Sequence, residues 1–406
     1  MPSTKTASTN RHCMVVHAYY PLGEIRVQRE AKALIDDGFE VDVICLRRPD
    51  EPARASEYGV QIYRLPIKRH KQFGAFVQLL EYLAFFILAS WQLLTLYLKN
   101  RYKTIQTHNL PDFLVFSALI PKLMGARVIL DLHDLMPEFY ASRFGGNLNA
   151  LPVKLVILQE RVSCWFADHV ITVTEAWRQT LIERGVAPEK CSVVMNLPDP
   201  AIFLNGNGAS EDVPAEGVSR IFYHGNVTFR YGLDILVKAF GEAFKALPHA
   251  RLMIHGRGDY QVELAKLIDE LGLSHVVTFS TELIPLDEVV SLIKTADLAV
   301  VPYRYDIFTD GILPTKLMEY AALEVPTIAT TSTAIQSYFD EQMVHFVPAD
   351  NVPCLSEAMV KVLSDEAYLK RLSKNIRRFN QSFSWPNEAE SYTRLVQALC
   401  DKGLTK

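Results

Sequence analysis

Short apolar runs rich in β-branched residues alternate with longer helical patterns over almost the whole chain. Such runs are typical of strands buried inside a parallel sheet, and the helices between them are the connections that this kind of sheet requires. The alternation therefore predicts an α/β fold with doubly wound sheets. Because the chain has 406 residues, more than one hydrophobic core usually supports, we expect two domains of this kind.

The predicted strands fall into two groups, separated by a segment that is poor in apolar residues. In the first group the strands are expected at 13–17, 40–46, 61–65, 104–107, 127–132, 170–173 and 192–195. In the second group they are expected at 220–223, 251–255, 276–279, 298–301 and 327–329, with further helices after residue 352. The segment between the groups, LNGNGASEDVPAEG at 204–217, is dense in glycine, asparagine and acidic residues and indicates an interdomain linker.

The composition excludes several classes of protein. Charged residues make up 22% of the chain and the formal net charge is -4, so no global basic field favours binding to nucleic acid. The six cysteines are scattered and form no C-x-x-C pair, which argues against a disulfide framework or a cysteine-based metal site. The apolar stretch at 13–16 is shorter than a signal-peptide core, so we expect a cytoplasmic protein.

The segment 76–98, FVQLLEYLAFFILASWQLLTLYL, departs from this rhythm because it is long and strongly apolar. Only the part after Glu81 is free of charge, and its length is at the lower limit for crossing a bilayer. A spanning helix would also place the strands before and after it on opposite sides of a membrane, so we reject that interpretation. The basic run KRHK at 68–71 favours peripheral contact of 68–98 with anionic lipid at the inner face of the plasma membrane. A buried helix that covers the sheet, preceded by a solvated basic loop, fits the pattern equally well.

The segment 308–329, FTDGILPTKLMEYAALEVPTIA, carries the most chemical information. Pro314 suits the first turn of a helix, and the free backbone N–H groups at 312–315 are then expected to form a pocket for an anion such as a diphosphate. Lys316 adds a positive charge, and Glu319 lies one and a half turns into the helix, where its carboxylate can accept both hydroxyl groups of a ribose. An ordinary helix with a solvent-exposed glutamate is the alternative interpretation.

This segment resembles the donor-site signature P-x-K-x-x-E-Y-x-A-x-x-x-P of glycosyltransferase family 4, the group 1 glycosyltransferases of bacterial polysaccharide biosynthesis. Further strings resemble the same family in the same order along the chain: HNLPD at 108–112, DLHD at 131–134, TVTE at 172–175, YHGN at 223–226, RYGLD at 230–234 and ARLMIHGRG at 250–258. The resemblance implies a GT-B fold, in which two Rossmann-like doubly wound domains face each other across a cleft. It also implies a hexosyltransferase that uses a UDP- or GDP-linked sugar and needs no other cofactor.

The resemblance assigns a role to each part of the chain. Residues 1–204 are expected to form an N-terminal acceptor-side domain, followed by a linker at 205–217. Residues 218–384 are expected to form a C-terminal domain that binds the nucleotide sugar, and 385–406 a helix that crosses back to the N-terminal domain. The ligands of such sheets bind beyond the carboxyl ends of the strands, so we expect the functional residues in the loops there.

The family's motifs imply roles for individual residues of the second domain. Glu319 matches the second glutamate of the E-x7-E motif and is expected to bind the donor ribose. Gly311 stands where the first glutamate would meet the donor sugar, so this contact is absent or is made by Asp310. Arg230 falls near the arginine and lysine pair that binds the diphosphate, but the usual lysine position is Tyr231.

The full set of residues that the resemblance implies is larger. The catalytic candidates are His133, Arg230 and Lys316. The donor-binding candidates are Gly23, Gly225, Asn226, Gly256, Glu282, Asp310, Gly311, Ile312, Leu313, Pro314, Thr315 and Glu319. In the first domain His133 is expected beside the donor sugar, with His108 as a weaker candidate. Gly23 and Arg26 belong to a predicted glycine loop near the phosphates or the acceptor, for which a plain turn is the alternative.

No D-x-D pair occurs in the chain, so the usual acidic ligand for a divalent metal that bridges a sugar nucleotide is missing. The sequence predicts metal-independent transfer, in which Arg230, Lys316 and a helix N-terminus stabilise the charge on the departing diphosphate. Family 4 members retain the anomeric configuration, which implies same-face attack on a donor by a lipid-linked or cell-surface polysaccharide acceptor. The alternatives are a nucleotide-sugar epimerase or phosphorylase on the same fold, and a catalytically silent nucleotide-binding subunit suggested by Gly311 and Tyr231.

Overall fold

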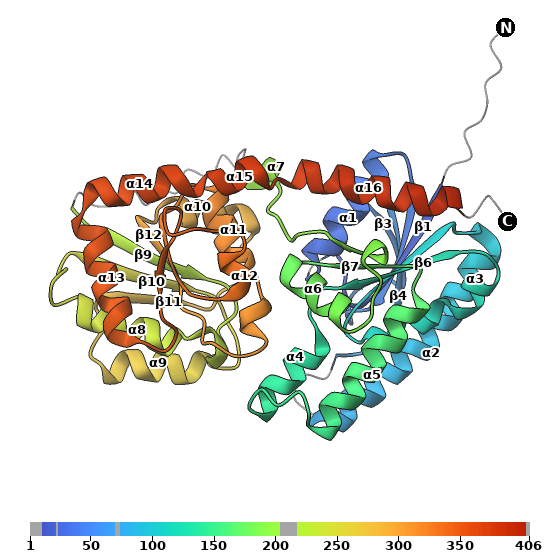
Figure 1. Ribbon diagram of the computed structural model, residues 1–406, viewed down its shortest axis with the longest axis horizontal. Coiled ribbons are helices and arrows are strands. Elements are labelled where there is room, and N and C mark those ends of the chain that lie inside the picture. The colour runs from blue at the N-terminus through green and yellow to red at the C-terminus, as the bar shows by residue number, and fades with distance from the viewer. Residues whose placement is uncertain (1–9, 22, 70–73, 204–216, 403–406) are drawn as a thin grey trace, which may run out of the picture. The chain divides into compact units, whose positions relative to one another are not determined.

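The chain folds into two compact units (Figure 1), each with a largely parallel sheet and helices packed against it. The computed structural model describes residues 10–21, 23–69, 74–203 and 217–402. Unit 1 comprises residues Met1–Met195 and Pro386–Lys406, and unit 2 comprises Asn196–Trp385. Both units are therefore α/β domains, as the alternation of strands and helices in the sequence predicts.

The sheet of unit 1 has the strand order β3-β4-β2-β1-β5-β6-β7-β8. Its strands are β1 (Arg11–Tyr19), β2 (Glu40–Leu46), β3 (Arg54–Glu57), β4 (Val60–Leu65), β5 (Thr104–His108), β6 (Arg127–Leu132), β7 (His169–Thr172) and β8 (Cys191–Val193). All neighbouring strands pair in parallel except β3 and β4, which are antiparallel. The central strand β1 is buried except at its two terminal residues, because helices cover both faces of such a sheet.

The helices of unit 1 connect these strands. They are α1 (Ile25–Asp36), α2 (Gly74–Asn100), η1 (Asp112–Ala118), α3 (Leu119–Leu123), α4 (Met136–Ala141), η2 (Ser142–Phe144), α5 (Leu151–Phe166), α6 (Glu175–Glu183), η3 (Pro188–Lys190) and α16 (Trp385–Lys402). The C-terminal helix α16 packs on this unit, where the hydroxyl of Tyr392 donates to Oε1 of Gln106 at 2.7 Å. The backbone N–H of Met195 also donates to the carboxylate of Glu388 at 3.1 Å.

By length and composition, α2 is the one helix in the described part of the chain that could cross a membrane. However, β4 and β5, the strands before and after α2, belong to the same sheet through β2 and β1. A spanning α2 would separate strands that are hydrogen-bonded into one sheet, so α2 lies along unit 1 instead. The charge of Glu81 within this apolar helix faces inward, with Oε1 lying 3.0 Å from Nε2 of the buried His17.

The sheet of unit 2 has the order β11-β10-β9-β12-β13-β14, and all of its neighbouring strands pair in parallel. Its strands are β9 (Ser219–His224), β10 (Ala250–His255), β11 (Val277–Ser280), β12 (Leu298–Val301), β13 (Thr327–Thr330) and β14 (His345–Val347). Its helices are α7 (Pro200–Phe203), η4 (Phe229–Tyr231), α8 (Leu233–Ala243), α9 (Gln261–Glu270), α10 (Leu286–Lys294), η5 (Thr309–Gly311), α11 (Thr315–Ala322), α12 (Thr333–Gln336), α13 (Val352–Ser364), α14 (Glu366–Ile376) and α15 (Arg378–Ser382).

The boundary between the units lies at Met195, earlier than the predicted end of the first domain at residue 204. The reason is that α7 packs against α10 and α11, both of which belong to unit 2. The predicted linker at 205–217 lies outside the described residues except for Gly217.

Each sheet has a point where the chain reverses the direction in which it adds strands. In unit 1 the chain runs from β1 out through β2 and β4 and returns to place β5 on the other side of β1. In unit 2 it runs from β9 through β10 and β11 and returns to place β12 beside β9. Ligands of doubly wound sheets bind beyond the carboxyl ends of the strands at such switch points. The loops after β1, β5, β9 and β12 are therefore the places to look for a site.

Candidate active site

A buried lysine lies at the switch point of unit 2, where it is enclosed by tyrosines. Lys316, in the first turn of α11, donates from Nζ to the hydroxyl of Tyr303, two residues after β12, at 2.6 Å. The same ammonium lies 4.8 Å from the ring centres of Tyr223 and Tyr303 and 5.0 Å from that of Tyr231. We refer to Tyr223, Tyr231 and Tyr303 as the tyrosine box. Aromatic faces attract a cation, so the box holds Lys316 in place, and no carboxylate of the described residues forms an ion pair with it.

The environment of Lys316 brings its charge under the control of pH near neutrality. Burial lowers the pKa of Lys316 to about 7, and the charge of Glu319 limits the shift. Tyr231 stacks on Tyr303 with ring centres 4.2 Å apart and forms one wall of the box. Tyr231 stands where the resemblance to family 4 implies a lysine, and in this chain its ring packs against the ammonium of Lys316.

Glu319 is held by a histidine that ends β9. The Nε2 atom of His224 lies 2.6 Å from Oε2 of Glu319, and its Nδ1 lies 2.9 Å from the hydroxyl of Tyr320. With Nε2 protonated, His224 donates to Glu319 and accepts from Tyr320, which fixes the orientation of the ring. Glu319 is 22% exposed, so the alternative of an ordinary solvent-exposed glutamate is wrong. His224 is not among the residues that the sequence motifs indicate, although a histidine that ends a buried strand just before Gly225 is a usable signal.

Gly256, a predicted donor-binding residue, and the nearby Gly258 are required by packing within the protein. A Cβ atom at Gly256 would lie 1.8 Å from the carbonyl oxygen of Gly225, and one at Gly258 would lie 2.0 Å from that of Val227. The loops that follow β9 and β10 therefore touch through their backbones, and this contact alone explains the glycines. Asn226, after β9, and Glu282, after β11, are exposed, and their contact with the donor stays a prediction.

Arg230 lies in η4, between the end of β9 and α8. Its guanidinium lies 4.8 Å from the ring centre of Phe308, and Nε lies 3.6 Å from Oδ2 of Asp306. The side chain is 21% exposed, so it is accessible to a ligand. The carbonyl oxygen of Arg230 also accepts a hydrogen bond from the N–H of Arg304, which ties η4 to the loop after β12.

The segment before α11 differs from its prediction in two respects. Free N–H groups were expected at each position of 312–315, but Ile312 donates to the carbonyl of Thr309 at 3.3 Å. Pro314 has no N–H, so only Leu313 and Thr315 remain as possible anion donors among these residues. The carboxylate of Asp310 accepts from the backbone N–H and hydroxyl of Thr333 at 2.7 and 2.8 Å. Asp310 thus stabilises the start of α12, and a contact with a donor sugar would compete with this role.

Two histidines and one aspartate meet at the carboxyl ends of β5 and β6 in unit 1. Nε2 of His133 lies 3.2 Å from Oδ2 of Asp131 and 3.1 Å from Nδ1 of His108. Burial lowers the pKa of His133, but the charge and hydrogen bond of Asp131 outweigh burial, so the pKa lies above its ordinary value. Burial lowers the pKa of His108 to about 4. His133 is 18% exposed and His108 is fully buried, so His133 is the one that can meet a ligand.

Arg26 has a structural role that differs from the predicted one. Its guanidinium donates to both carboxylate oxygens of Asp131 at 2.9 Å and to the carbonyl of Val194 at 2.7 Å. These buried bonds leave Arg26 unsuited to a phosphate or acceptor, so that expectation is wrong. Gly23 is exposed with a φ of +115°, which suits a plain turn after β1.

The same cluster has the composition of a metal site. The candidate ligand atoms of His108, Asp131 and His133 lie within 4.8 Å of one another. The guanidinium of Arg26, however, already binds both oxygens of Asp131, so a cation is present where a metal ion would have to bind. The cluster fits a charged hydrogen-bond network better than a metal centre.

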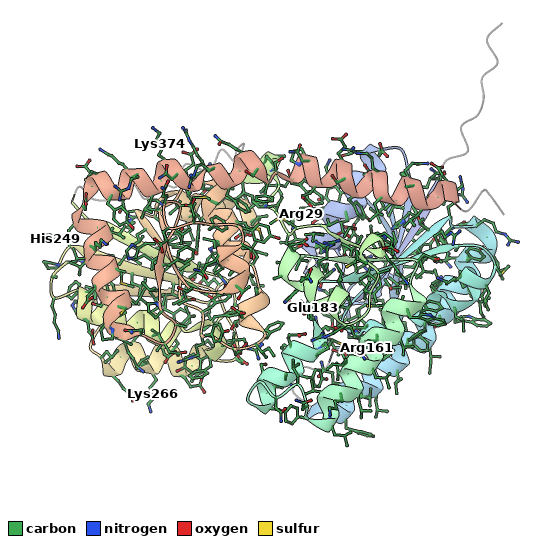
Figure 2. All side chains as sticks on the ribbon, viewed as in Figure 1. Arg29, Arg161, Glu183, His249, Lys266 and Lys374 are labelled. Carbon is green, nitrogen blue, oxygen red and sulfur yellow. The ribbon has the colours of Figure 1, made fainter. Side chains whose placement is uncertain are left out.

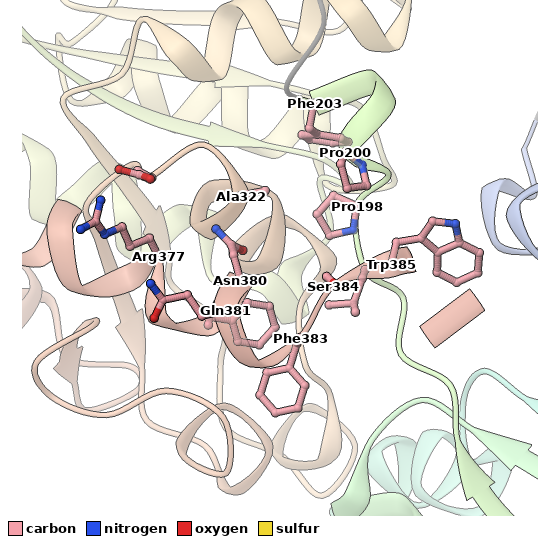
Figure 3. Close-up of a pocket in the computed structure, with 13 residues that line it drawn as sticks. Pro198, Pro200, Phe203, Ala322, Arg377, Asn380, Gln381, Phe383, Ser384 and Trp385 are labelled. Carbon is pink, nitrogen blue, oxygen red and sulfur yellow. The ribbon is translucent and has the colours of Figure 1, made fainter. Parts of the chain in front are cut away.

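Unit 2 also has a cavity of about 390 Å³ away from its switch point (Figure 3). It is lined mainly by residues of α7, α15 and the segments beside them, including Pro200, Phe203, Arg377 and Phe383. None of the predicted donor-site residues lines this cavity. Its walls are largely apolar and contain a single arginine, which does not match the charge of a diphosphate.

Two domain families cover most of the chain. Residues 23–196 match the family described as "Glycosyl transferase 4-like domain". Residues 211–379 match the family described as "Glycosyl transferases group 1". The chain belongs to the group 1 glycosyltransferases of family 4. The resemblance that the sequence motifs indicated is thereby confirmed, and Lys316 and Glu319 lie within the group 1 match.

Known relatives in this family include mannosyltransferases. The chain is 22% identical over 262 residues to the chitobiosyldiphosphodolichol beta-mannosyltransferase of Candida albicans, covering 61% of this chain and 57% of the relative. It is 27% identical over 175 residues to a GDP-mannose-dependent monoacylated alpha-(1-6)-phosphatidylinositol monomannoside mannosyltransferase of Corynebacterium glutamicum, covering 42% of this chain and 44% of the relative. The matched region thus spans about half the length of each of these relatives.

Solved structures of glycosyltransferases share the fold over nearly the whole chain. A sucrose-phosphate synthase from Thermosynechococcus elongatus aligns with a TM-score of 0.75 at 20% identity, covering 96% of this chain and 99% of that one. This likeness confirms the predicted GT-B fold with its two parallel-sheet α/β units.

Proposed function

We propose that this family member transfers a hexose from a nucleoside-diphosphate sugar to a lipid-linked or cell-surface glycan acceptor. The proposal rests on one observation: Lys316 and Glu319 both lie at the switch point of the second sheet. A buried ammonium suits a diphosphate, and a carboxylate held by His224 suits the two hydroxyl groups of a ribose. These two groups lie on one helix, three residues apart, so both ends of a nucleoside diphosphate can be bound together.

The names of the relatives favour mannose as the sugar and guanosine as the nucleoside. Both relatives are mannosyltransferases, and the name of one of them states that it depends on GDP-mannose. Both names also describe acceptors that carry a lipid part. We therefore propose GDP-mannose as the donor and a lipid-linked acceptor, used in the cytoplasm at the inner face of the plasma membrane.

The residues of the chain suggest how transfer proceeds. Arg230 and Lys316 stabilise the negative charge that develops on the departing diphosphate, in the manner of preorganised cations in other active sites. His133, which lies beside Asp131 at the carboxyl end of β6, orients the sugar and stabilises the positive character that develops on it. We propose retention of configuration, with the acceptor attacking on the face from which the diphosphate leaves and a phosphate oxygen taking the acceptor proton.

A catalytically silent subunit and an epimerase are the competing functions. Gly311 has no carboxylate for the donor sugar, and the carboxylate of Asp310 is bound by Thr333, which favours a silent subunit. An epimerase would convert its donor in the absence of an acceptor, whereas a transferase needs the acceptor for rapid turnover.

A panel of nucleotide sugars, each with and without a polyprenyl-diphosphate-linked glycan, tests the proposal by nucleotide release and by mass spectrometry of the glycan. We expect release of GDP together with one added hexose, only when both substrates are present, and an unchanged anomeric configuration by NMR. Tight donor binding without release of any nucleotide would show a silent subunit, and a changed sugar without an acceptor would show an epimerase.

A further inference from the structure

One face of α5 is apolar and exposed along its whole length. Every third or fourth residue contributes to it, and the series is Leu151, Leu155, Leu158, Val162 and Trp165. Their exposed fractions run from 42% at Val162 to 79% at Trp165. The opposite side of the helix is buried in unit 1 through Val153, Glu160 and Cys164. The spacing is that of an amphipathic helix, but here the outward side is the apolar one.

The helix α2 presents a second apolar series to the solvent, at the same spacing. It consists of Phe76, Leu80, Leu83, Ile87 and Trp91, with exposed fractions from 41% to 72%. The two helices are linked through η1, because Phe113 of η1 packs on Phe86 of α2 and Phe116 of η1 packs on Phe166 of α5. In the view of Figure 1, α2 and α5 are drawn in the same part of unit 1. We call the two exposed series together the docking face.

On these two helices the acidic side chains are buried, whereas the exposed charged side chains are basic. Their carboxylates are buried, Glu81 against His17 and Glu160 against Arg184. The ionisable side chains that α2 and α5 expose, within the described residues, are all cationic: Lys99, Lys154 and Arg161. Lys68 and Arg69, just before the undescribed part of the basic run at 68–71, are exposed as well. This sorting contrasts with the chain as a whole, whose formal net charge is -4.

A basic hollow lies at the C-terminal end of α5, next to the docking face. It measures about 560 Å³ and is lined by Arg161, Trp165, Arg184 and Lys190, among others. Arg184 donates hydrogen bonds to the carboxylates of Glu160 and Glu138, and Lys190 donates to the carbonyl oxygen of Trp165. Arg161 makes no hydrogen bond or ion pair with another side chain in the described part of the protein. Figure 2 shows Arg161 on α5 with Glu183 near it, the one carboxylate in the lining.

We infer that the docking face binds an anionic lipid bilayer, with Arg161 at the basic hollow taking the phosphate of a lipid headgroup. Exposed apolar residues insert below the headgroups, tryptophans favour the interface between lipid and water, and cations attract the anionic surface. A second copy of the chain fits this face less well, because two such faces would bring their unpaired cations together. The inference deepens the proposed function by adding α5 and a headgroup site to the membrane contact expected from 68–98.

Flotation of the full chain with phosphatidylcholine vesicles, with and without phosphatidylglycerol, tests the inference. We expect binding only to vesicles that contain phosphatidylglycerol, and a loss of roughly tenfold or more in K154E/R161E, as expected for two cations near an anionic surface. The variant L155Q/L158Q should lose binding to a similar extent. Val262→Gln and Lys266→Glu, on the exposed face of α9 in unit 2, are the matched controls and should bind like the wild type.

The inference is overturned if the docking-face variants float like the wild type. It is also overturned if sedimentation shows a dimer that L155Q/L158Q dissociates while binding to vesicles is unchanged, since a second copy then covers the face. Nucleotide-sugar turnover with an acceptor dispersed in detergent is measured in parallel. It should be the same in the wild type and in every docking-face variant, so a failure of docking and a failure of transfer give different results.

Discussion

The lowered pKa of Lys316 predicts that the affinity for the donor depends on pH near neutrality. Burial lowers the pKa of Lys316 to about 7, so above that pH the free enzyme must take up a proton to pair with a diphosphate. We expect the affinity for GDP-mannose to fall as pH rises above 7, by at most about tenfold per pH unit. Isothermal titration calorimetry measures it, and the esterified phosphates of the sugar nucleotide do not titrate in this range.

The variant Lys316→Met is the control for this pH dependence. It should bind the donor more weakly, and its affinity should no longer change with pH above neutrality. If the same slope persists in Lys316→Met, the proton belongs to another group and the role given to Lys316 is wrong.

The position of His133 predicts how its replacement affects catalysis. It is the partly exposed member of the cluster with His108 and Asp131, so it can act on the sugar without holding the nucleotide. We expect His133→Ala to lower kcat by roughly 10²-fold or more, within the range for a positioned catalytic group, with little change in donor affinity. Steady-state kinetics and calorimetry separate the two effects, and an equal loss of donor affinity would contradict the assignment.

The sequence located Lys316 and Glu319 but not the residues that hold them. The signature is local, since both residues lie on α11 and are separated by less than one turn. Their partners His224 and Tyr303 come from the ends of β9 and β12, and only the strand order brings these ends together. No periodicity or motif in a single sequence encodes that pairing, and the same reason explains why Arg26 was misassigned.

At the scale of elements, the close contact between the loops after β9 and β10 predicts that one added methyl group lowers the stability of the protein strongly. Ala at position 256 would place Cβ 1.8 Å from the carbonyl oxygen of Gly225. We therefore expect Gly256→Ala to destabilise the protein by at least about 2–3 kcal/mol, because backbone atoms must move apart. Thermal unfolding monitored by circular dichroism measures the change.

Gly272→Ala is the matched control for this substitution. Gly272 also has a positive φ, +67°, but nothing lies within 4 Å of the added Cβ. It should lose only the roughly 1–2 kcal/mol that a left-handed conformation costs a residue with a side chain. Equal losses in the two variants would mean that backbone conformation, and not the contact between the loops, determines the effect.

The elements that the sequence predicted well are the central strands. Strands such as β2 and β6 are buried almost throughout, so their apolar runs are visible without the structure. The sequence analysis missed β3 and β14, which lie at sheet edges and are short. β3 has the sequence RASE and is partly exposed along its whole length, so pairing with β4 makes it a strand and hydrophobic patterning does not. The exposed apolar face of α5 was missed because apolar spacing alone does not tell which side of a helix is buried.

At the scale of the whole molecule, the charge on the leaving diphosphate has to be stabilised by the residues of the chain. Lys316 and Arg230 lie near the switch point of unit 2, and the chain contains no D-x-D pair. We expect turnover to be unchanged after dialysis against EDTA and unaffected by added magnesium. Activity that EDTA abolishes and magnesium restores would contradict metal-independent transfer.

The central claim is that the nucleoside diphosphate binds at the switch point of the second sheet, between the ends of β9 and β12 and the start of α11. Hydrogen–deuterium exchange with and without GDP, read by mass spectrometry, tests this location most directly. We predict slower exchange in the segments 225–232, 302–304 and 313–318, because a bound diphosphate stabilises those backbones. Slower exchange confined to 197–203 and 377–385, around the cavity of Figure 3, would contradict the claim.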